Sequence, residues 1–165
     1  MAIKQGRALV ASNSVVKTKE PSAEAVLQSF IANLNPKIQK LFKSVRTAVR
    51  KRFPAANELA YDYGTHVVIS YSPTEAGAEG ILAIAGRSDG VQLYLTQGKQ
   101  LPDPKKLLQG SANARYIWLE SAAKLAHADV KSLIDAALKI SKKAFPSKGE
   151  GKLIIRPTAA AKRRK

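Results

Sequence analysis

The residues of this sequence best suited to chemistry are basic, and their spacing favours anion binding over catalysis. Between residues 37 and 57 the chain carries seven bases and no acid. At 100° per residue most of these bases fall on one face of a helix, and no acid lies one turn away to neutralise them. The face predicted to bind polyanions consists of Lys37, Lys40, Lys43, Arg46, Arg50 and Lys51.

The formal net charge of +16 is concentrated toward the two ends of the 165-residue chain. Residues 1–19 hold four bases and no acid, and residues 141–165 hold nine bases against Glu150. A near-neutral domain with two cationic arms is typical of a protein that binds polyanions. We therefore expect nucleic acid or another polyanion as partner, bound without sequence specificity. The C-terminal contacts are predicted at Lys162, Arg163, Arg164 and Lys165.

A second group of residues combines arginines with aromatic rings, as a pocket for a small anion does. Arg87 and Arg115 can each hold a carboxylate or phosphate through two parallel hydrogen bonds. The alternative is that the rings fill the core or a homodimer contact. The possible pocket comprises Glu58, Tyr61, Tyr63, Arg87, Tyr94, Arg115 and Trp118.

Metal-binding and catalytic patterns are weak. Glu58, Asp62 and His66 share strand parity but form a sparse candidate metal site, because hard iron sites need several oxygen ligands and the twelve acids are dispersed. The chain has no cysteine, which excludes thiolate chemistry. Ser70, His66 and Asp62 lack a nucleophile elbow, and residues 86–90 lack the spacing of a phosphate loop. We therefore expect neither an enzyme nor a bound cofactor.

Composition and hydrophobic periodicity predict one domain with basic flanks. The expected divisions are a basic disordered arm at 1–20, the domain at 21–146, and a basic linker and tail at 147–165. No segment approaches the roughly 18 consecutive apolar residues of a membrane span. We therefore expect a cytoplasmic protein with no membrane partner.

The helices are predicted from caps and apolar stripes. Ser22 is expected to cap a short first helix, and Asn35 to cap a second helix that runs to Phe53. Asp129 is expected to cap a last helix that Pro146 stops. Two helices thus precede the central segment of the domain and one follows it.

Alternation of apolar and polar residues predicts a sheet of five antiparallel strands in that central segment. The order of elements favours an α+β domain with the helices packed on one face of the sheet. The strands are expected at residues 58–63, 66–72, 81–85, 91–95 and 115–120.

Two shorter segments and one sheet face complete the expected domain. Pro102 is expected to open a short helix that Gly110 ends. The apolar run 153–155 is expected to dock on the core or to pair with a sheet edge. The sheet face away from the helices is a candidate binding surface, which would carry His66, Tyr94, Tyr116 and Trp118.

The end of the second helix and the entry to the sheet carry a recognisable order of residues. Phe53 is followed by Pro54-Ala55-Ala56-Asn57-Glu58 and then by Tyr61, Tyr63 and Gly64. This order resembles the YdhG-like family of small bacterial domains of unknown function, over about residues 24–140. The family implies an α+β fold with a curved antiparallel sheet. Some of its members have been described as frataxin-like iron chaperones, which implies a small-ligand or iron-handling function as an alternative.

The sequence departs from the family pattern in two places. Many relatives have a proline shortly after the glycine, whereas Thr65 and His66 follow Gly64 here. A Lys-x-His-like segment of the family is replaced by residues 87–90. A homodimeric structural or interaction module is the second alternative to polyanion binding. The resemblance carries functional implications only to Glu58, Tyr61, Tyr63 and Gly64.

Overall fold

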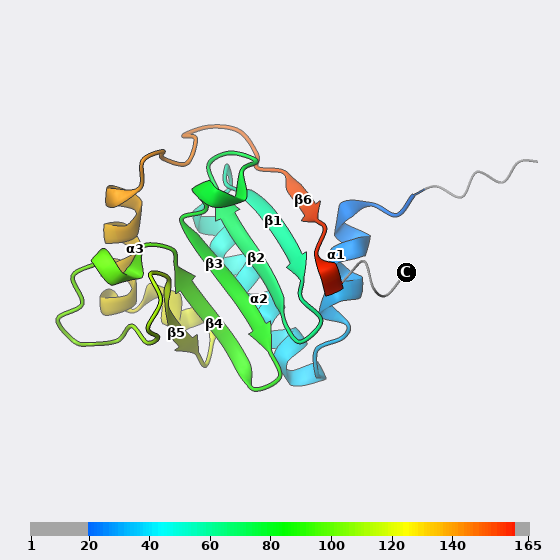
Figure 1. Cartoon of the computed structure of the whole chain (residues 1–165), viewed down its shortest axis with the longest axis horizontal. Coiled ribbons are helices and arrows are strands. Elements are labelled where there is room, and N and C mark those ends of the chain that lie inside the picture. The colour runs from blue at the N-terminus through cyan, green and yellow to red at the C-terminus, as the bar shows by residue number, and fades with distance from the viewer. Residues whose placement is uncertain (1–19, 161–165) are drawn as a thin grey trace, which may run out of the picture.

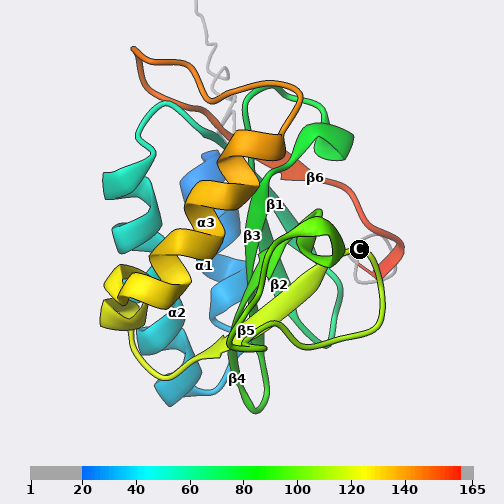
Figure 2. The same cartoon turned by 90° about the vertical axis from the view of Figure 1, so that its left-hand side faces the viewer.

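A computed structural model of the chain describes residues 20–160 and confirms an α+β fold. A six-stranded sheet carries three α-helices on one side (Figures 1 and 2). Within the described residues no helix is both long and apolar enough to cross a membrane. In chain order the elements are α1 (Ala23–Ile31), α2 (Pro36–Arg52), β1 (Asn57–Asp62), β2 (Val67–Ser72), η2 (Gly77–Glu79), β3 (Leu82–Arg87), β4 (Gly90–Leu95), η3 (Gly98–Gln100), β5 (Arg115–Leu119), η4 (Ala122–Ala126), α3 (Ala128–Ile140) and β6 (Leu153–Arg156), where η marks a short 3-10 helix.

The first two helices begin where the sequence predicts. The Ser22 hydroxyl accepts a hydrogen bond from the backbone N–H of Ala25 at 3.1 Å, and the Asn35 side chain accepts one from the N–H of Ile38 at 3.0 Å. Both caps satisfy donors that the first helical turn leaves unpaired. Gly86 of β3 lets α2 approach the sheet closely, because a Cβ there would lie 2.9 Å from the Phe42 ring.

The sheet has six strands, one more than expected, in the order β5-β4-β3-β2-β1-β6. Strands β1 to β5 pair antiparallel as predicted, whereas β6 pairs parallel with β1. The segment 147–165, expected as linker and tail, thus contributes an edge strand through the apolar run 153–155. The Glu58 N–H donates to the Lys152 carbonyl at 2.8 Å, and Leu153 and Ile155 pack against the core.

The strand register gives the sheet two different faces. Ile69 of β2 lies beside Ile84 of β3, which lies beside Leu93 of β4, and all three are fully buried on the side of the helices. The neighbouring positions point to the opposite side, because successive residues of a strand alternate. That second face carries Tyr94, Tyr116 and Trp118, as the alternation predicts.

The prediction of a short helix after Pro102 was wrong. Residues 102–108 contain only a turn at 104–105, and the Asp103 carboxylate accepts hydrogen bonds from the backbone N–H groups of Leu107 at 2.9 Å and Leu108 at 2.8 Å. An aspartate side chain that takes backbone donors in this way competes with helix formation. Lys106 also has a φ of 53°, which a right-handed helix does not allow.

The last helix also differs from the prediction at both ends. It begins at Ala128, and Asp129 lies in its first turn without capping it. It ends at Ile140, well before Pro146. The Ser141 hydroxyl donates to the Leu138 carbonyl at 2.9 Å, so a serine takes up a carbonyl that the helix leaves free at its end.

We predict that Gly151→Ala displaces β6 from β1. A Cβ at Gly151 would lie 1.7 Å from the backbone oxygen of Ala56, which no side-chain adjustment relieves. Exchange of the Glu58 amide hydrogen, which donates to Lys152, will therefore become faster in the variant. Hydrogen exchange followed by NMR measures it.

Gly149→Ala is the matched control for this prediction. Nothing lies within 4 Å of a Cβ at Gly149, so the substitution costs only the strain of its positive φ, about 1–2 kcal/mol. The Glu58 amide should keep its protection in this control. Unchanged protection in Gly151→Ala as well would contradict the pairing of β6 with β1.

Candidate functional site

Arg46 does not belong to the cationic face, which corrects the prediction. It is 6% exposed, and its guanidinium donates to Glu58 through Nε at 2.9 Å and Nη2 at 2.8 Å. It lies four residues after Phe42 and three before Val49, both of which are buried, so it falls on the inner side of α2. Its charge is therefore satisfied inside the molecule.

Glu58 also faces the helices and not the predicted pocket. It is 4% exposed, and the Tyr71 hydroxyl donates to its Oε2 at 3.1 Å. Glu24 of α1 binds the outer side of the same Arg46 guanidinium at 2.7 and 2.9 Å. We call Glu24, Arg46, Glu58 and Tyr71 the buried ionic network. A buried charge is stable only with such partners, so the network holds α1, α2, β1 and β2 together.

The network shifts the pKa values of its members. Hydrogen bonds from Arg46 lower the pKa of Glu24 to about 2. Burial raises the pKa of Tyr71 well above its usual range, and the neighbouring Glu58 charge adds to the effect. At neutral pH Glu24 is therefore charged and the Tyr71 hydroxyl keeps the proton that it donates.

The cationic face that remains on α2 is smaller and points to solvent. Its four lysines are exposed and form no ion pair with a carboxylate of the described residues. Arg50 is 57% exposed, and its Nε lies 3.6 Å from Glu58. The basic residues Lys162, Arg163, Arg164 and Lys165 lie outside the described residues. We call Lys37, Lys40, Lys43, Arg50 and Lys51 the α2 cationic face.

A groove of about 610 Å³ runs beside this face. Lys43, Thr47 and Arg50 line it from α2, at a spacing that places them on one side of the helix. Glu58 and Glu150 also line the groove and bring negative charge to it. The groove is therefore a place where a phosphate-sized anion can meet several donors at once.

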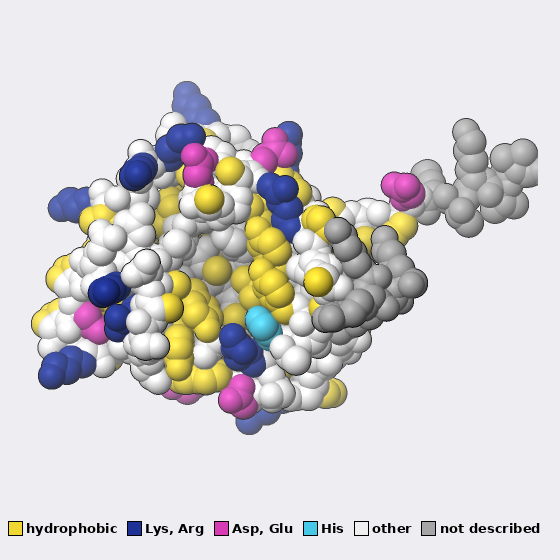
Figure 3. Space-filling model, in the orientation of Figure 1, with side chains coloured by type: hydrophobic (Ala, Val, Ile, Leu, Met, Phe, Trp, Pro, Cys, Tyr) yellow, Lys and Arg dark blue, Asp and Glu magenta, His cyan; other side chains and the backbone are white. Residues whose placement is uncertain are grey.

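The opposite face of the sheet is hollowed at its centre, and Figure 3 shows hydrophobic side chains gathered on both sides of the hollow. The central strands carry small side chains on this face, at Ser70, Ala83 and Ala85. The outer strands carry large ones, among them Tyr94, which pairs with Ala83. This difference in side-chain size creates a hollow, which we call the sheet hollow.

Aromatic rings form the two walls of the sheet hollow. Tyr94 and Tyr116 lie 5.3 Å apart between ring centroids, and Tyr116 meets Trp118 edge to face at 6.0 Å. On the other side Tyr63 stacks on Tyr61 at 5.7 Å and on His66 at 5.0 Å. Burial is the main cause that lowers the pKa of His66, and the nearby Arg87 adds to it.

The predicted pocket residues are therefore only partly brought together. Arg87, Tyr94 and Trp118 line one cavity of about 460 Å³ at the end of the sheet hollow nearest the β3–β4 turn. Arg115 lies elsewhere, because its place in β5 has the opposite parity and its Nε donates to the Ala112 carbonyl at 2.6 Å. Sequence reasoning missed Gln92, although its polar position in an otherwise apolar strand was a usable signal.

The weak metal candidates do not form a cluster. Glu58 and Asp62 face the helices, whereas His66 lies on the other face of the sheet beside Tyr63. Within residues 20–160 no three acidic or histidine side chains are placed to hold one metal ion. The equal spacing of Glu58, Asp62 and His66 in the sequence does not place them on one side of the sheet, because the chain turns between β1 and β2.

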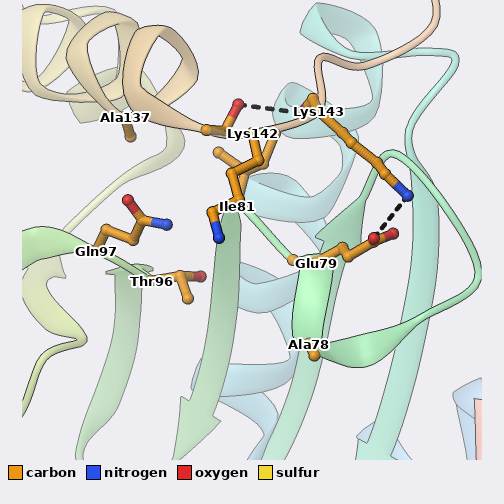
Figure 4. A pocket seen from close by; sticks show the side chains of 10 residues that line it. Ala78, Glu79, Ile81, Thr96, Gln97, Ala137, Lys142 and Lys143 are labelled. Carbon is orange, nitrogen blue, oxygen red and sulfur yellow. Dashed lines mark hydrogen bonds and ion pairs between the residues drawn. The ribbon is translucent and has the colours of Figure 1, made fainter.

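A third cavity, of about 160 Å³, lies between the end of α3 and the sheet (Figure 4). Ile81, Thr96 and Ala137 contribute to its lining, and Lys143 forms an ion pair with Glu79 at 2.7 Å across its border. Hydrogen bonds from Lys143 and Thr74 lower the pKa of Glu79. Lys143 and Glu79 therefore neutralise each other, and Lys142 is the other charged side chain in the lining.

Comparison with known proteins adds no assignment to these sites. No family model, curated protein or solved structure matches the chain. The interpretation of the sites therefore rests on their own geometry.

We predict that Glu58→Gln destabilises the protein by about 3 kcal/mol, because it leaves a buried guanidinium without its main partner. Glu24→Gln removes a carboxylate from the same guanidinium, but the Glu24 side chain is 51% exposed, so its loss will cost about 1 kcal/mol at most. Urea unfolding at neutral pH measures both values. Equal costs would contradict the central place of Glu58.

The lowered pKa of Glu24 predicts a pH dependence of stability. The pKa is lower in the folded protein than the ordinary value of 4.5, so the ion pair contributes fully above about pH 4.5 and is lost as the pH falls toward 2. Glu24→Gln will flatten the stability profile in this window, by about 1 kcal/mol at most because solvent screens the pair. Glu20→Gln is the control, because it removes the same charge as Glu24→Gln at a residue outside the buried ionic network. Parallel profiles for the wild type and Glu24→Gln would refute the prediction.

Proposed function

We propose that this protein is a non-enzymatic binding domain for polyanions, with nucleic acid as the class of partner. The observation that carries the proposal is the α2 cationic face, whose four lysines are exposed and lack a described carboxylate partner. Unpaired surface bases attract phosphates more strongly than bases whose charge a nearby carboxylate offsets. The net charge of +16 supports the same class of partner.

The length of the face suits a polymeric anion. Lys40 and Lys51 are eleven residues apart, which corresponds to about 16 Å along a helix axis. A strand of DNA carries one phosphate per about 3.4 Å of its axis, so the face can meet several phosphates. Lys43, Thr47 and Arg50 in the adjoining groove add donors for one of them. Such contacts position a backbone without reading bases, so the binding proposed is non-specific.

We also propose that the chain belongs to the YdhG-like family. The support for this proposal is the order of two helices, an antiparallel sheet and a closing helix over residues 24–140. The iron-handling alternative receives no favouring observation, since Glu58 is engaged by Arg46 and His66 lies on the opposite sheet face. Homodimer formation and a cytoplasmic location also stay predictions.

We predict that replacing Lys40, Lys43 and Lys51 together by glutamine weakens binding to mixed-sequence double-stranded DNA. The slope of log affinity against log salt concentration will fall in magnitude by about two to three, because each phosphate contact contributes about 0.9. Fluorescence anisotropy of labelled DNA with the full chain, repeated at several salt concentrations, measures the slope.

The matched control replaces Lys99, Lys131 and Lys139 by glutamine. These lysines are also exposed and lie on η3 and α3, outside the α2 cationic face, and the variant has the same net charge. If both triple variants lower the slope equally, general charge and not the α2 cationic face carries the binding.

A third variant neutralises residues 162–165 without truncation, because a deletion at 147 would remove β6. If only this third variant loses binding, the C-terminal bases and not α2 are the contact.

A further inference from the structure

The sheet hollow contains a guanidinium that is held in position but has no carboxylate partner among the described residues. Arg87 Nε donates to the Gln92 side-chain oxygen at 2.7 Å, and Nη2 lies 3.4 Å from the Tyr94 hydroxyl. Its Nη1 donates to no described group. Nη1 and the second hydrogen of Nη2 therefore have no partner among the described residues, and Arg87 lines the cavity.

The walls around this guanidinium favour a flat ring. Tyr94, Tyr116 and Trp118 line the same cavity of about 460 Å³, and Gly90 lies so close to Trp118 that a Cβ there would meet its ring at 3.0 Å. Small-molecule pockets usually measure about 300–1,000 Å³ and combine apolar walls with a few placed polar groups. Figure 3 shows the hollow open to solvent, with a histidine and a basic side chain together at its edge.

The charges around the cavity favour a singly charged anion. Arg87 is the cation that lines it, and Asp89 at its border is a negative charge. Thr65, also in the lining, lies within 2.9 Å of the His66 ring through its hydroxyl. One guanidinium edge matches the two oxygens of one carboxylate, whereas a phosphate dianion would keep one charge uncompensated beside Asp89.

We propose that the sheet hollow binds a small planar aromatic carboxylate. Its carboxylate accepts two hydrogen bonds from Arg87, and its ring packs against Tyr94 and Trp118 in offset or edge-to-face contacts. Gln92 and the Tyr94 hydroxyl hold the guanidinium before the ligand arrives, which limits the entropy lost on binding. This site lies on the opposite side of the sheet from α2 and is independent of polyanion binding.

The test uses Trp118, the one tryptophan of the chain, as a fluorescent reporter inside the proposed site. The full chain is titrated with benzoate, with cyclohexanecarboxylate, which has the charge without the flat ring, and with benzamide, which has the ring without the charge. We expect a saturable change with benzoate and affinities at least tenfold weaker for the other two. No saturable change by about 10 mM benzoate, ten times a millimolar Kd, would overturn the proposal.

Two variants with equal charge separate the proposed contact from general attraction. Arg87→Gln should raise the Kd for benzoate at least tenfold, because a hydrogen bond to a charged group is lost. Lys139→Gln removes one positive charge on the helix side, outside both proposed sites, and should leave that Kd unchanged. Thermal unfolding of both variants shows that they are folded. Equal affinities in Arg87→Gln and wild type would overturn the assignment of Arg87.

Further arms identify the anion and keep the two proposals distinct. Phenyl phosphate should bind more weakly than benzoate, and tighter binding would overturn the choice of a carboxylate. The triple glutamine variant of α2 should bind benzoate like the wild type, whereas Arg87→Gln should keep the DNA affinity of the wild type. Loss of benzoate binding in the α2 variant would contradict a separate site.

Discussion

The buried ion pair between Arg46 and Glu58 is the interaction on which the arrangement of helices and sheet depends. It joins α2 to β1 in the layer between helices and sheet, where either charge alone would be costly. Tyr71 and Glu24 bring β2 and α1 to the same contact. Because Arg46 must point inward, the rotation of α2 about its axis is fixed, and with it the direction of the exposed lysines on its other side.

Two surfaces with different chemistry follow from this arrangement. The helix layer turns the α2 cationic face outward, where a long anion can lie across it. The far face of the sheet keeps its hollow because Ser70, Ala83 and Ala85 are small while Tyr94 and Trp118 beside them are large. The sheet separates the two surfaces, so one suits a polymer backbone and the other a small ring with a single charge.

Much of the fold could be predicted because local rules decide it. Caps at Ser22 and Asn35 and the alternation of β2 and β4 need only neighbouring residues. The rest depends on contacts between distant residues. The partner of Arg46 is twelve residues away across a turn, and the parallel pairing of β6 with β1 joins residues about 95 positions apart.

In the candidate sites, too, local patterns could be predicted from the sequence, whereas contacts between distant residues could not. The alternation of side chains along the strands predicts that Tyr94 and Trp118 lie on the same face of the sheet. It does not predict that the Arg115 side chain turns toward the Ala112 carbonyl. The helical spacing predicts Arg46 on the cationic face beside Arg50, but its spacing from Phe42 and Val49 also places it at the edge of the buried stripe. Buried charges escape sequence reasoning because their partners come from other elements.

A double-mutant cycle tests most directly the claim that this ion pair fixes α2 on the sheet. Arg46→Met, Glu58→Met and the double variant would be compared with the wild type by urea unfolding at neutral pH. We expect an interaction energy of about 2–3 kcal/mol, with the double variant more stable than the sum of the single losses implies. An interaction energy below about 0.5 kcal/mol, the scatter of independent sites, would contradict it.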